Sequence, residues 1–466
     1  MGGIDRLGAH SSGTITGFGS VIVNGVEWEV SGTTDITIDD APGTESGLAV
    51  GQVVLITGEL DNSGTSGTAT SIEYDSVLEG NVTSINLAGD SFVVLGQTVS
   101  VSSSTVFDDS LPDRSGPGGT PDGRRTLADL LVGDNLEISG FPTSAGVIQA
   151  TRIDDRGGAS GAEVRGVVSA LNTVAETFLI GTLNVDYSNA TLEDFSSALA
   201  NGNLVEVEGS LSGGTLVATR VELEDNLPGD DGDSGEVEGL VTRFVSATDF
   251  DVNGVRVTTV AGTQYEGGTA GNLGLNVKVE VEGEFNAQGI LVADEVKFRV
   301  QEGSADVEIE GNVAARTSTT LTIEGMDAIT ISVNAATQLE DDRSSPQPGF
   351  NFSHVVVGDF VEIRGAPNTA TGDPNDVIAT RLERDDDEDD TILQGPVQSF
   401  AGPVVLVLGV AIATDAIDVA FFDVNDDEIS SATFFSSIGV GSIIKAKADE
   451  LRVFGNDFDA EEIEIE

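Results

Sequence analysis

The sequence predicts an all-β protein, built as a tandem array of about six small barrels. One observation is internal repetition: VGDNLEISG at 132–140 returns as VGDFVEIRG at 357–365. A second is the strict alternation of apolar and charged residues in phrases such as VEVEG at 205–209, which is typical of strands with one buried and one solvated face. The third is the glycine content, 58 residues, which indicates many turns.

Each unit opens with a short apolar strand that begins at a glycine. The copies of this opening phrase start at Gly13, Gly80, Gly166, Gly239, Gly311 and Gly395. Self-similarity at a regular spacing marks repeated structural units, so the copies predict six units of about 65–85 residues each.

The centre of each unit carries the phrase V-G-x-x-h-x-h-x-G, where h is apolar. Its closing glycines are Gly58, Gly140, Gly209, Gly283 and Gly365, and a sixth copy at 440–448 has Ala448 at that position. The first glycine fits a turn with a positive φ angle. The closing glycine fits a bulge or sharp bend of the kind that small barrels need. An A-T-R-h strand then ends several units, at 150–153, 218–221 and 379–382.

Helical spacing is nearly absent, and only 124–133 and 190–202 are expected to form a helical turn or two. The unit is longer than a propeller blade of about 40–50 residues and shorter than an immunoglobulin-like sandwich of about 100. A small antiparallel β-barrel of OB-like size fits best, because closure removes exposed strand edges. A β-solenoid is the main alternative, but its repeats would be shorter and more regular.

The predicted domain boundaries follow from the repeats. They are an N-terminal tail at 1–12, barrels at 13–76, 77–157, 158–224, 233–300 and 306–384, and a divergent sixth barrel at 391–466. Acidic, glycine-rich linkers are expected at 154–163, 225–236 and 384–390, because such runs bury little apolar area and repel themselves.

The charge balance argues against nucleic acid as a partner. Asp and Glu total 79 against 21 Lys and Arg, which gives a formal charge of −58, whereas nucleic-acid binding needs clustered cations to displace phosphate counterions. No cysteine occurs, which excludes disulfides and thiol chemistry. No apolar run of about 18 residues is present, so no transmembrane segment is expected.

Acidic loops are the predicted metal sites. Hard cations such as Ca²⁺ take several oxygen ligands, and acidic loops supply carboxylates and carbonyls, so Ca²⁺ is the cofactor that we consider. The residues are Asp423, Asn425, Asp427 and Glu428; Asp230, Asp231, Asp233 and Glu236; and Asp457, Asp459 and Glu461. None of the three segments completes the EF-hand pattern, and loose attraction of counterions is the alternative.

No catalytic residue is expected. The two histidines, His10 and His354, lie in different units, and no G-x-S-x-G elbow accompanies them. P-loop and G-x-G-x-x-G fingerprints are also missing. Carboxylate pairs are abundant, but the aromatic platforms that usually line sugar sites are scarce, with Trp28 the only tryptophan.

The phrases at 17–30, 48–60 and 94–107, together with the VEVEG and A-T-R strands, resemble the repeats of a bacterial family, the domain of unknown function DUF5666. The resemblance covers nearly the whole chain, most clearly 13–300. It implies an exported protein, often a lipoprotein whose mature chain starts with cysteine followed by glycines. Met1 stands directly before GGID, so we expect an initiator methionine in place of that cysteine and a lipid tether in the native protein.

The function expected from these features is a non-enzymatic, exported protein of the outer membrane, periplasm or cell exterior. Its role would be structural, adhesive or ligand-presenting, with assistance from cations. One alternative is a subunit of a self-assembling extracellular filament, because the terminal strand EEIEIE at 461–466 could dock on a neighbour's open edge. Another is a hydrolase of an extracellular polymer with carboxylates as acid and base. The partners considered are therefore a second copy, an extracellular polymer or a protein.

Overall fold

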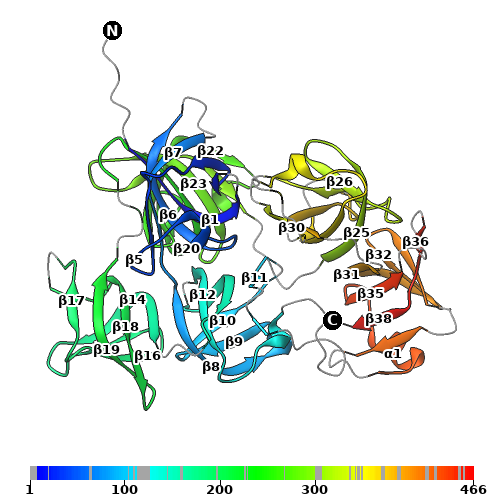
Figure 1. Ribbon diagram of the computed structural model, residues 1–466, viewed down its shortest axis with the longest axis horizontal. Helices are drawn as coiled ribbons and strands as arrows, with labels where there is room; N and C mark the ends of the chain where they lie inside the picture. The colour runs from blue at the N-terminus through cyan, green and yellow to red at the C-terminus, as the bar shows by residue number, and fades with distance from the viewer. Residues whose placement is uncertain are drawn as a thin grey trace, which may run out of the picture. The chain divides into compact units, whose positions relative to one another are not determined.

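A computed structural model gives the architecture (Figure 1). The structure describes residues 8–18, 20–61, 66–102, 104–108, 111–112, 126–143, 145–157, 161–195, 198–224, 227, 229–266, 268–299, 307–334, 337–341, 343, 347, 350–368, 373–385, 390–414, 419–423, 428–449, 453–454 and 457–465. The chain divides into two compact units, Met1–Ile15 with Ser20–Gln301 and Thr16–Gly19 with Glu302–Glu466. The first unit holds four barrels and the second holds two.

Each barrel closes through five strands. In the first, β1 (Ala9–Gly17), β2 (Val21–Val23) and β3 (Val26–Glu29) form a meander, and β6 (Val53–Leu60) pairs antiparallel with β1 and with β7 (Ser66–Tyr74). The barrel closes where β3 and β7 pair in parallel, which adds a parallel pairing to the predicted antiparallel barrel. The reason is the odd number of strands, which cannot alternate in direction all the way around a closed barrel.

The next three barrels repeat this strand path. The second contains β8 (Leu78–Asn86), β9 (Ser91–Val94), β10 (Gln97–Ser100), β11 (Val106–Phe107), β12 (Asn135–Pro142) and β13 (Ile148–Asp155). The third contains β14 (Ala162–Asn172), β15 (Thr177–Ile180), β16 (Leu183–Asp186), β17 (Thr191–Glu193), β18 (Leu204–Ser212) and β19 (Thr215–Leu223). The fourth contains β20 (Ser234–Ser246), β21 (Asp249–Val252), β22 (Val255–Glu266), β23 (Lys278–Phe285) and β24 (Leu291–Phe298). The parallel closures are β10 with β13, β16 with β19 and β22 with β24.

The second unit contains the fifth and sixth barrels. The fifth has β25 (Val307–Arg316), β26 (Thr320–Ile323), β27 (Ile331–Ser332), β28 (Gln338–Asp341), β29 (Phe360–Pro367) and β30 (Val377–Asp385). The sixth has β31 (Asp390–Ala401), β32 (Val404–Val407), β33 (Val410–Ala413), β34 (Ala420–Phe422), β35 (Ile443–Asp449), β36 (Val453–Phe454), β37 (Asp457–Asp459) and β38 (Glu462–Ile465), with helix α1 (Ser431–Ser437). Its closing strand is broken in two: β37 is parallel to β33, and β38 is antiparallel to β35.

Short elements fill the connections. In the first barrel, β4 (Asp35–Ile38) runs parallel to β7, and β5 (Ala41–Pro42) pairs with β4. Single 3₁₀ turns lie at η1 (Glu45–Gly47), η2 (Leu87–Gly89), η3 (Leu127–Asp129), η4 (Ala270–Asn272) and η5 (Phe352–His354). The helical turn predicted within 124–133 is therefore present as η3. Within 190–202, Thr191–Glu193 instead forms strand β17 because it pairs with β19.

The predicted bulge lies at the closing glycine of five barrels. Strand register shifts directly before Gly58, Gly140, Gly209, Gly283 and Gly365. A Cβ atom at Gly209 would lie 2.2 Å from the carbonyl oxygen of Val217, so the two strands approach too closely there for any side chain. In the sixth barrel, β35 and β38 pair without a register shift from Ile444 to Lys447.

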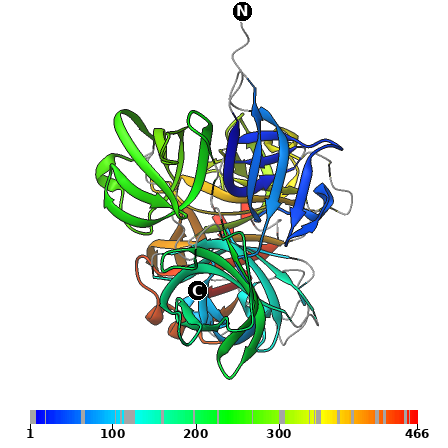
Figure 2. The ribbon, with the colours of Figure 1, turned by 90° about the vertical axis from the view of Figure 1, so that its left-hand side faces the viewer.

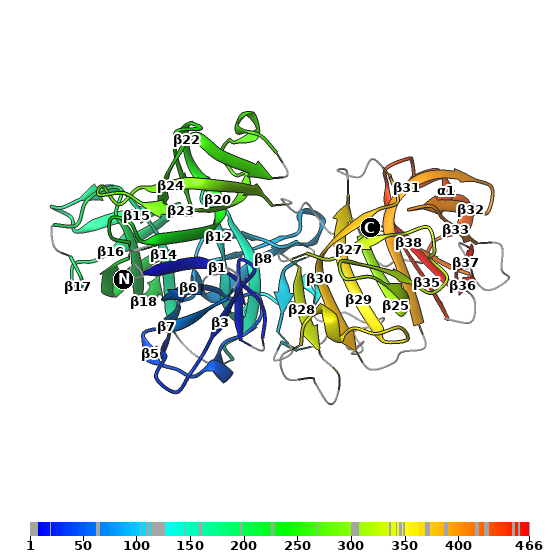
Figure 3. The same cartoon turned by 90° about the horizontal axis from the view of Figure 1, so that it is seen from above.

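Strand pairing joins the barrels two by two, the first with the fourth, the second with the third and the fifth with the sixth, and we call these junctions the inter-barrel seams. β1 runs parallel to β20 with Ala9 opposite Ser234, β8 is antiparallel to β14 with Glu79 opposite Glu163, and β25 is antiparallel to β31. Figure 2 shows the first barrel (blue) beside the fourth (green), and Figure 3 shows β1 beside β20. Each such pair of barrels therefore forms one continuous sheet.

The seams also change some predicted boundaries. β1 begins at Ala9, inside the predicted tail 1–12, because its first residues pair with β6 and with β20. The predicted linkers are shorter than expected, because β20 begins at Ser234 inside 225–236 and β30 extends to Asp385 inside 384–390.

Candidate functional site

A cluster of carboxylates around Arg220 lies between the first and third barrels. It is positioned by two neighbouring strands, in which Glu206 of β18 is opposite Glu222 of β19, and Glu208 is opposite Arg220. Val205 and Val207 alternate with these glutamates and are fully buried in the barrel core. The charged side chains consequently lie on the outer face of the barrel, where another barrel covers them.

The first barrel contributes Asp40 to this cluster. Asp40 lies in the turn between β4 and β5 and has a φ angle of 58°, a left-handed conformation that aspartate tolerates better than most residues. Its carboxylate forms an ion pair with Arg220. The turn therefore places an acidic group of one barrel against the strands of another.

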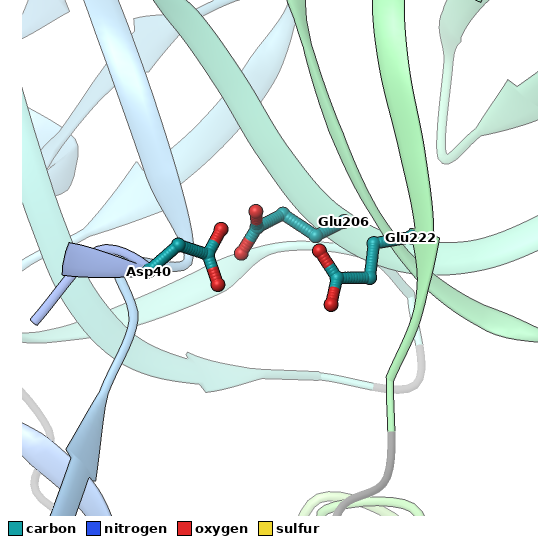
Figure 4. A group of neighbouring side chains, drawn as sticks. All are labelled: Asp40, Glu206 and Glu222. Carbon is teal, nitrogen blue, oxygen red and sulfur yellow. The ribbon is translucent and has the colours of Figure 1, made fainter. Parts of the chain in front are cut away.

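Arg220 is the cation that holds the cluster together. Its Nη2 lies 2.8 Å from Glu206 Oε1 and 2.7 Å from Glu208 Oε1, and the guanidinium also pairs with Asp40 and Glu222. One carboxylate oxygen from each of Asp40, Glu206 and Glu222 lies within 4.8 Å of the others, and Figure 4 shows the three carboxylates converging from a turn and two strands. One positive charge therefore faces several negative ones.

This crowding raises the pKa values of the buried acids. Burial, followed by the charge of nearby Glu163 and further carboxylates, raises the pKa of Glu206 to about 9. Burial likewise raises the pKa of Glu163 to about 8. For Glu222, burial outweighs the opposing charge of Arg220 and the pKa rises to about 7. Protons, as well as arginine, therefore neutralise this cluster near neutral pH.

A second group of acids lies between the first and second barrels. The Tyr74 hydroxyl donates a hydrogen bond of 2.7 Å to Glu137 Oε1. Arg156 reaches three acids, with Nη1 3.0 Å from Glu137 Oε2 and Nη2 3.1 Å from Glu79 Oε2 and 3.5 Å from Asp39 Oδ2. Burial, then the charge of Asp39, raises the pKa of Glu137 to about 7. The same combination of buried acids and one arginine thus recurs at a second junction.

The second unit has a similar cluster at its own seam. Oxygens of Glu308, Glu310 and Glu362 lie within 4.8 Å of one another. Lys445 of the sixth barrel lies 2.6 Å from Glu308 Oε2, and Arg364 Nε lies 2.7 Å from Glu362 Oε1. Cations from both barrels therefore hold the acids of this seam.

These clusters contain the carboxylates that could hold a metal ion among the described residues. The three groups with the required spacing are Asp40, Glu206 and Glu222; Glu163, Glu206 and Glu208; and Glu308, Glu310 and Glu362. Each includes acids already paired with arginine or lysine. A divalent ion would have to compete with those cations, so we treat the clusters primarily as charge-compensated junctions.

The structure places one set of predicted calcium residues, Asp230, Asp231, Asp233 and Glu236, at or just before the seam of β1 and β20. Asp233 accepts hydrogen bonds from the backbone N–H of Gly8 and of Asp230, each 2.9 Å long. Glu236 is opposite Ser11, whose hydroxyl donates to it at 3.4 Å. Asp230 and Asp231 lie in the preceding turn. In the described part of the chain, none of the four belongs to a carboxylate group with metal-like spacing.

The other two sets lie in the sixth barrel. Glu428 is brought beside Phe422, and so near Asp423, by a β-bridge, while Asn425 and Asp427 lie outside the described residues. Asp457 and Asp459 belong to β37, and Glu461 follows at the break before β38. Calcium binding by these segments stays a prediction.

The clustered residues were not predicted from the sequence, although the repeats contain a pattern that marks them. The arginine of the A-T-R strand pairs with an acid of its own or a neighbouring strand in three barrels: Arg152 with Asp154, Arg220 with Glu206, and Arg381 with Glu340. Its repetition in the sequence marked the position. Which barrel covers that position depends on the tertiary structure.

Together these features define a tandem-repeat protein of closed five-stranded β-barrels, fused through seams that bury charged residues. The chain belongs to the DUF5666 family. The model of this domain of unknown function matches residues 12–73, 79–154, 165–222, 238–297 and 310–383, which are the first five barrels. The predicted family and tandem-barrel architecture are confirmed.

No curated protein is significantly similar to the chain. Within the described residues, no helix has the length and apolarity that crossing a membrane requires.

Proposed function

We propose that this protein is a non-enzymatic, exported repeat protein with a structural, adhesive or ligand-presenting role at the cell envelope or outside the cell. The observation that carries the proposal is that strand pairing fuses the barrels in pairs and that the closely spaced acids lie in or beside the junctions between barrels. Such an arrangement supports a stiff scaffold that offers its outer loops and barrel faces to partners. Each barrel is of OB-like size and strand number.

The main alternative, from a different class of function, is an enzyme that hydrolyses an extracellular polymer. An acid–base pair needs two carboxylates that reach a substrate across a cleft. Glu206 and Glu222 have unequal pKa values, as such a pair requires. However, Glu206 is buried and both groups pair with Arg220. The pairing favours a structural role for the cluster.

The chemical test uses the full chain and a panel of extracellular polysaccharides and proteins. We expect no release of reducing ends or peptides by either the unaltered protein or Glu206→Gln. An activity that is present in the unaltered protein and lost in Glu206→Gln would overturn the proposal and identify the cluster as an active site. Glu59→Gln, at an exposed position on β6, is the matched control.

The location test requires the gene with its native upstream sequence. The proposed role places the protein in the envelope or the medium, so immunolabelling of intact cells and cell fractionation should detect it there. Retention in the cytosol would exclude that role. Labelling with a radioactive fatty acid tests the lipid anchor separately.

We also propose that Ca²⁺ stabilises the folded protein. Thermal unfolding in EDTA and in millimolar Ca²⁺ at matched ionic strength measures it, because a ligand that binds only the native state raises the melting temperature by mass action. A calcium-specific rise supports true sites in the acidic loops. An equal effect of Mg²⁺ and of added NaCl reduces the role of cations to charge screening.

A further inference from the structure

Every barrel has the same tight turn directly before its central strand. The turns are residues 48–51, 130–133, 199–202, 273–276, 355–358 and 438–441, and we call them the pre-strand turns. The last residue of each is left-handed, with φ angles of +90° at Gly51, +104° at Gly133, +94° at Gly202, +63° at Asn276, +89° at Gly358 and +90° at Gly441. In each case its N–H donates to a carbonyl of the opening strand, as Gly133 does to Val82 at 2.9 Å. The six turns are therefore structurally equivalent.

The residue before the left-handed position is the tip of the turn, and in most barrels it is apolar and exposed. The exposed fractions are 66% for Val132, 53% for Leu275, 60% for Val357 and 75% for Val440. Turn tips usually carry Gly, Asn, Asp or Ser. The third barrel follows that rule with Asn201. Apolar tips at four equivalent places thus need an explanation that the fold of each barrel does not supply.

The first barrel provides such an explanation, because its pre-strand turn packs against the second barrel. Val50 is only 5% exposed, and its carbonyl accepts a hydrogen bond of 3.1 Å from Arg152 Nη1 of the second barrel. A Cβ atom at Gly51 would lie 2.8 Å from the carbonyl oxygen of Thr151 and 3.0 Å from Val106. The turn therefore packs tightly on the face formed by β11 and β13 of its neighbour.

The equivalent face of the third barrel is exposed beside its arginine, Arg220, which itself pairs with Asp40 of the first barrel. Thr191 and Arg220 of that barrel correspond to Val106 and Arg152, because they occupy the same paired positions on β17 and β19. In the second barrel Val106 and Thr151 are buried under the docked turn. In the third, Thr191 and Thr219 are exposed, and neighbouring Leu192 is 43% exposed. The chain thus carries both free apolar turns and a second face of the receptor kind, on which Thr191, Leu192 and Thr219 are uncovered.

We propose that the exposed pre-strand turns dock on this receptor face of a second copy of the chain. The interface would repeat, between molecules, the contact that the first barrel makes with the second within one molecule. The turn of one molecule would contact the receptor face of the next molecule, so the interface is heterologous. Repeated contacts of this kind build open chains unless the rotation between neighbouring molecules closes them into a ring. The formal charge of −58 opposes association at low salt and does so less when ions screen it. This inference is independent of the structural role proposed above.

The test replaces the apolar tips by the residue that the third barrel already has. The variant combines Val132→Asn, Leu275→Asn, Val357→Asn and Val440→Asn, and the matched control is Val174→Asn, since Val174 is 94% exposed but lies outside the pre-strand turns. Sedimentation velocity measures the average mass of the full chain over a range of concentrations at low salt and in 0.5 M NaCl.

We expect the unaltered protein and the control to associate with rising concentration in salt, and the fourfold variant to associate at least about tenfold more weakly, because several buried apolar contacts are lost. Leu192→Asp on the receptor should weaken association as well. Circular dichroism should find all variants folded, because the altered side chains are exposed.

Two outcomes would overturn the proposal. One is an unaltered protein that stays monomeric at every concentration and salt condition. The other is a fourfold variant that associates as strongly as the control, which would assign association to a different surface.

Discussion

Arg220 illustrates how single residues compensate charge in this acidic chain. Its guanidinium contacts acids of its own strand, of the neighbouring strand and of another barrel. A guanidinium suits this task because it donates in several directions in one plane and always stays charged. Removing it would leave Glu206 buried without its cation.

The first prediction is that Arg220→Met destabilises the first unit by about 2–3 kcal/mol, somewhat less than the loss of a fully buried pair because Arg220 keeps some contact with solvent. The measurement is denaturant unfolding of the full chain. Arg243→Met is the control, since Arg243 also pairs with two acids, Asp249 and Asp251, but on an exposed surface, where such pairs contribute little. Equal losses in both variants would contradict the compensating role of Arg220.

A second residue-scale prediction concerns Asp341 in the second unit. Burial by itself would raise its pKa, but hydrogen bonds from Arg343 and Arg384, 2.7 and 2.6 Å long, outweigh burial and hold the pKa of Asp341 well below its usual range. The unfolded chain therefore binds the proton more readily, and the stabilisation present above about pH 4 is lost as pH falls through the folded-state pKa.

We expect Asp341→Asn to remove about 1–2 kcal/mol from the second unit at pH 7, after allowance for solvent screening, and less at pH 2. Hydrogen exchange of peptides from residues 350–368 measures this locally. A loss that is the same at both pH values would show that the carboxylate charge is not responsible.

At the scale of the strand, the closing glycine permits the bulge that five of the six barrels contain. Gly209→Ala would place a Cβ atom 2.2 Å from the Val217 carbonyl oxygen, so the strands must separate. We expect a loss of about 2 kcal/mol or more, measured as a lower melting temperature. Gly262→Ala is the control, because nothing lies within 4 Å of its Cβ position, and alanine there should be neutral or slightly stabilising.

The strand scale also explains which features were predictable. The bulge at Gly209 and the alternation of Val205 and Val207 are local, so the repeated phrase revealed them. The seam was not predictable, because the register of Ser11 opposite Glu236 joins segments far apart in the sequence. The surroundings of the predicted calcium residues were not predictable either, because the local sequence does not reveal that the oxygens of Asp233 accept hydrogen bonds from backbone N–H groups, one of them that of the distant Gly8.

For the first unit as a whole, the raised carboxyl pKa values predict sensitivity to alkali. The folded-state pKa values are about 9 for Glu206, 8 for Glu163, and 7 for Glu137, Glu73 and Glu222. At pH values between about 4.5, the pKa of glutamate in the unfolded chain, and these folded-state pKa values, the folded chain binds more protons than the unfolded chain. Stability therefore falls as pH rises through this window, and the proton-linked contribution is gone above about pH 9.

We expect the melting transition of the first unit to move down between pH 6 and pH 9, with a total loss of more than about 2 kcal/mol. Calorimetry at constant ionic strength measures the loss. Glu206→Gln should flatten the dependence, because an amide keeps the neutral form at every pH, whereas the exposed Glu59→Gln should leave it unchanged. A melting temperature that rises over this range would contradict the assignment.

The pairing of β1 with β20 has a consequence for how such proteins can change in length. In an open array, duplication or deletion of one repeat leaves the contacts of the remaining repeats in place. Here the opening strand of the first repeat is bonded to that of the fourth, so the second and third repeats lie within a loop of chain whose ends are joined. Inserting or removing a repeat inside that loop must break the junction or rebuild it. The number of repeats in the first unit, four, is therefore tied to the pairing of β1 with β20. Repeats can be added without disturbing this pairing only outside the first unit.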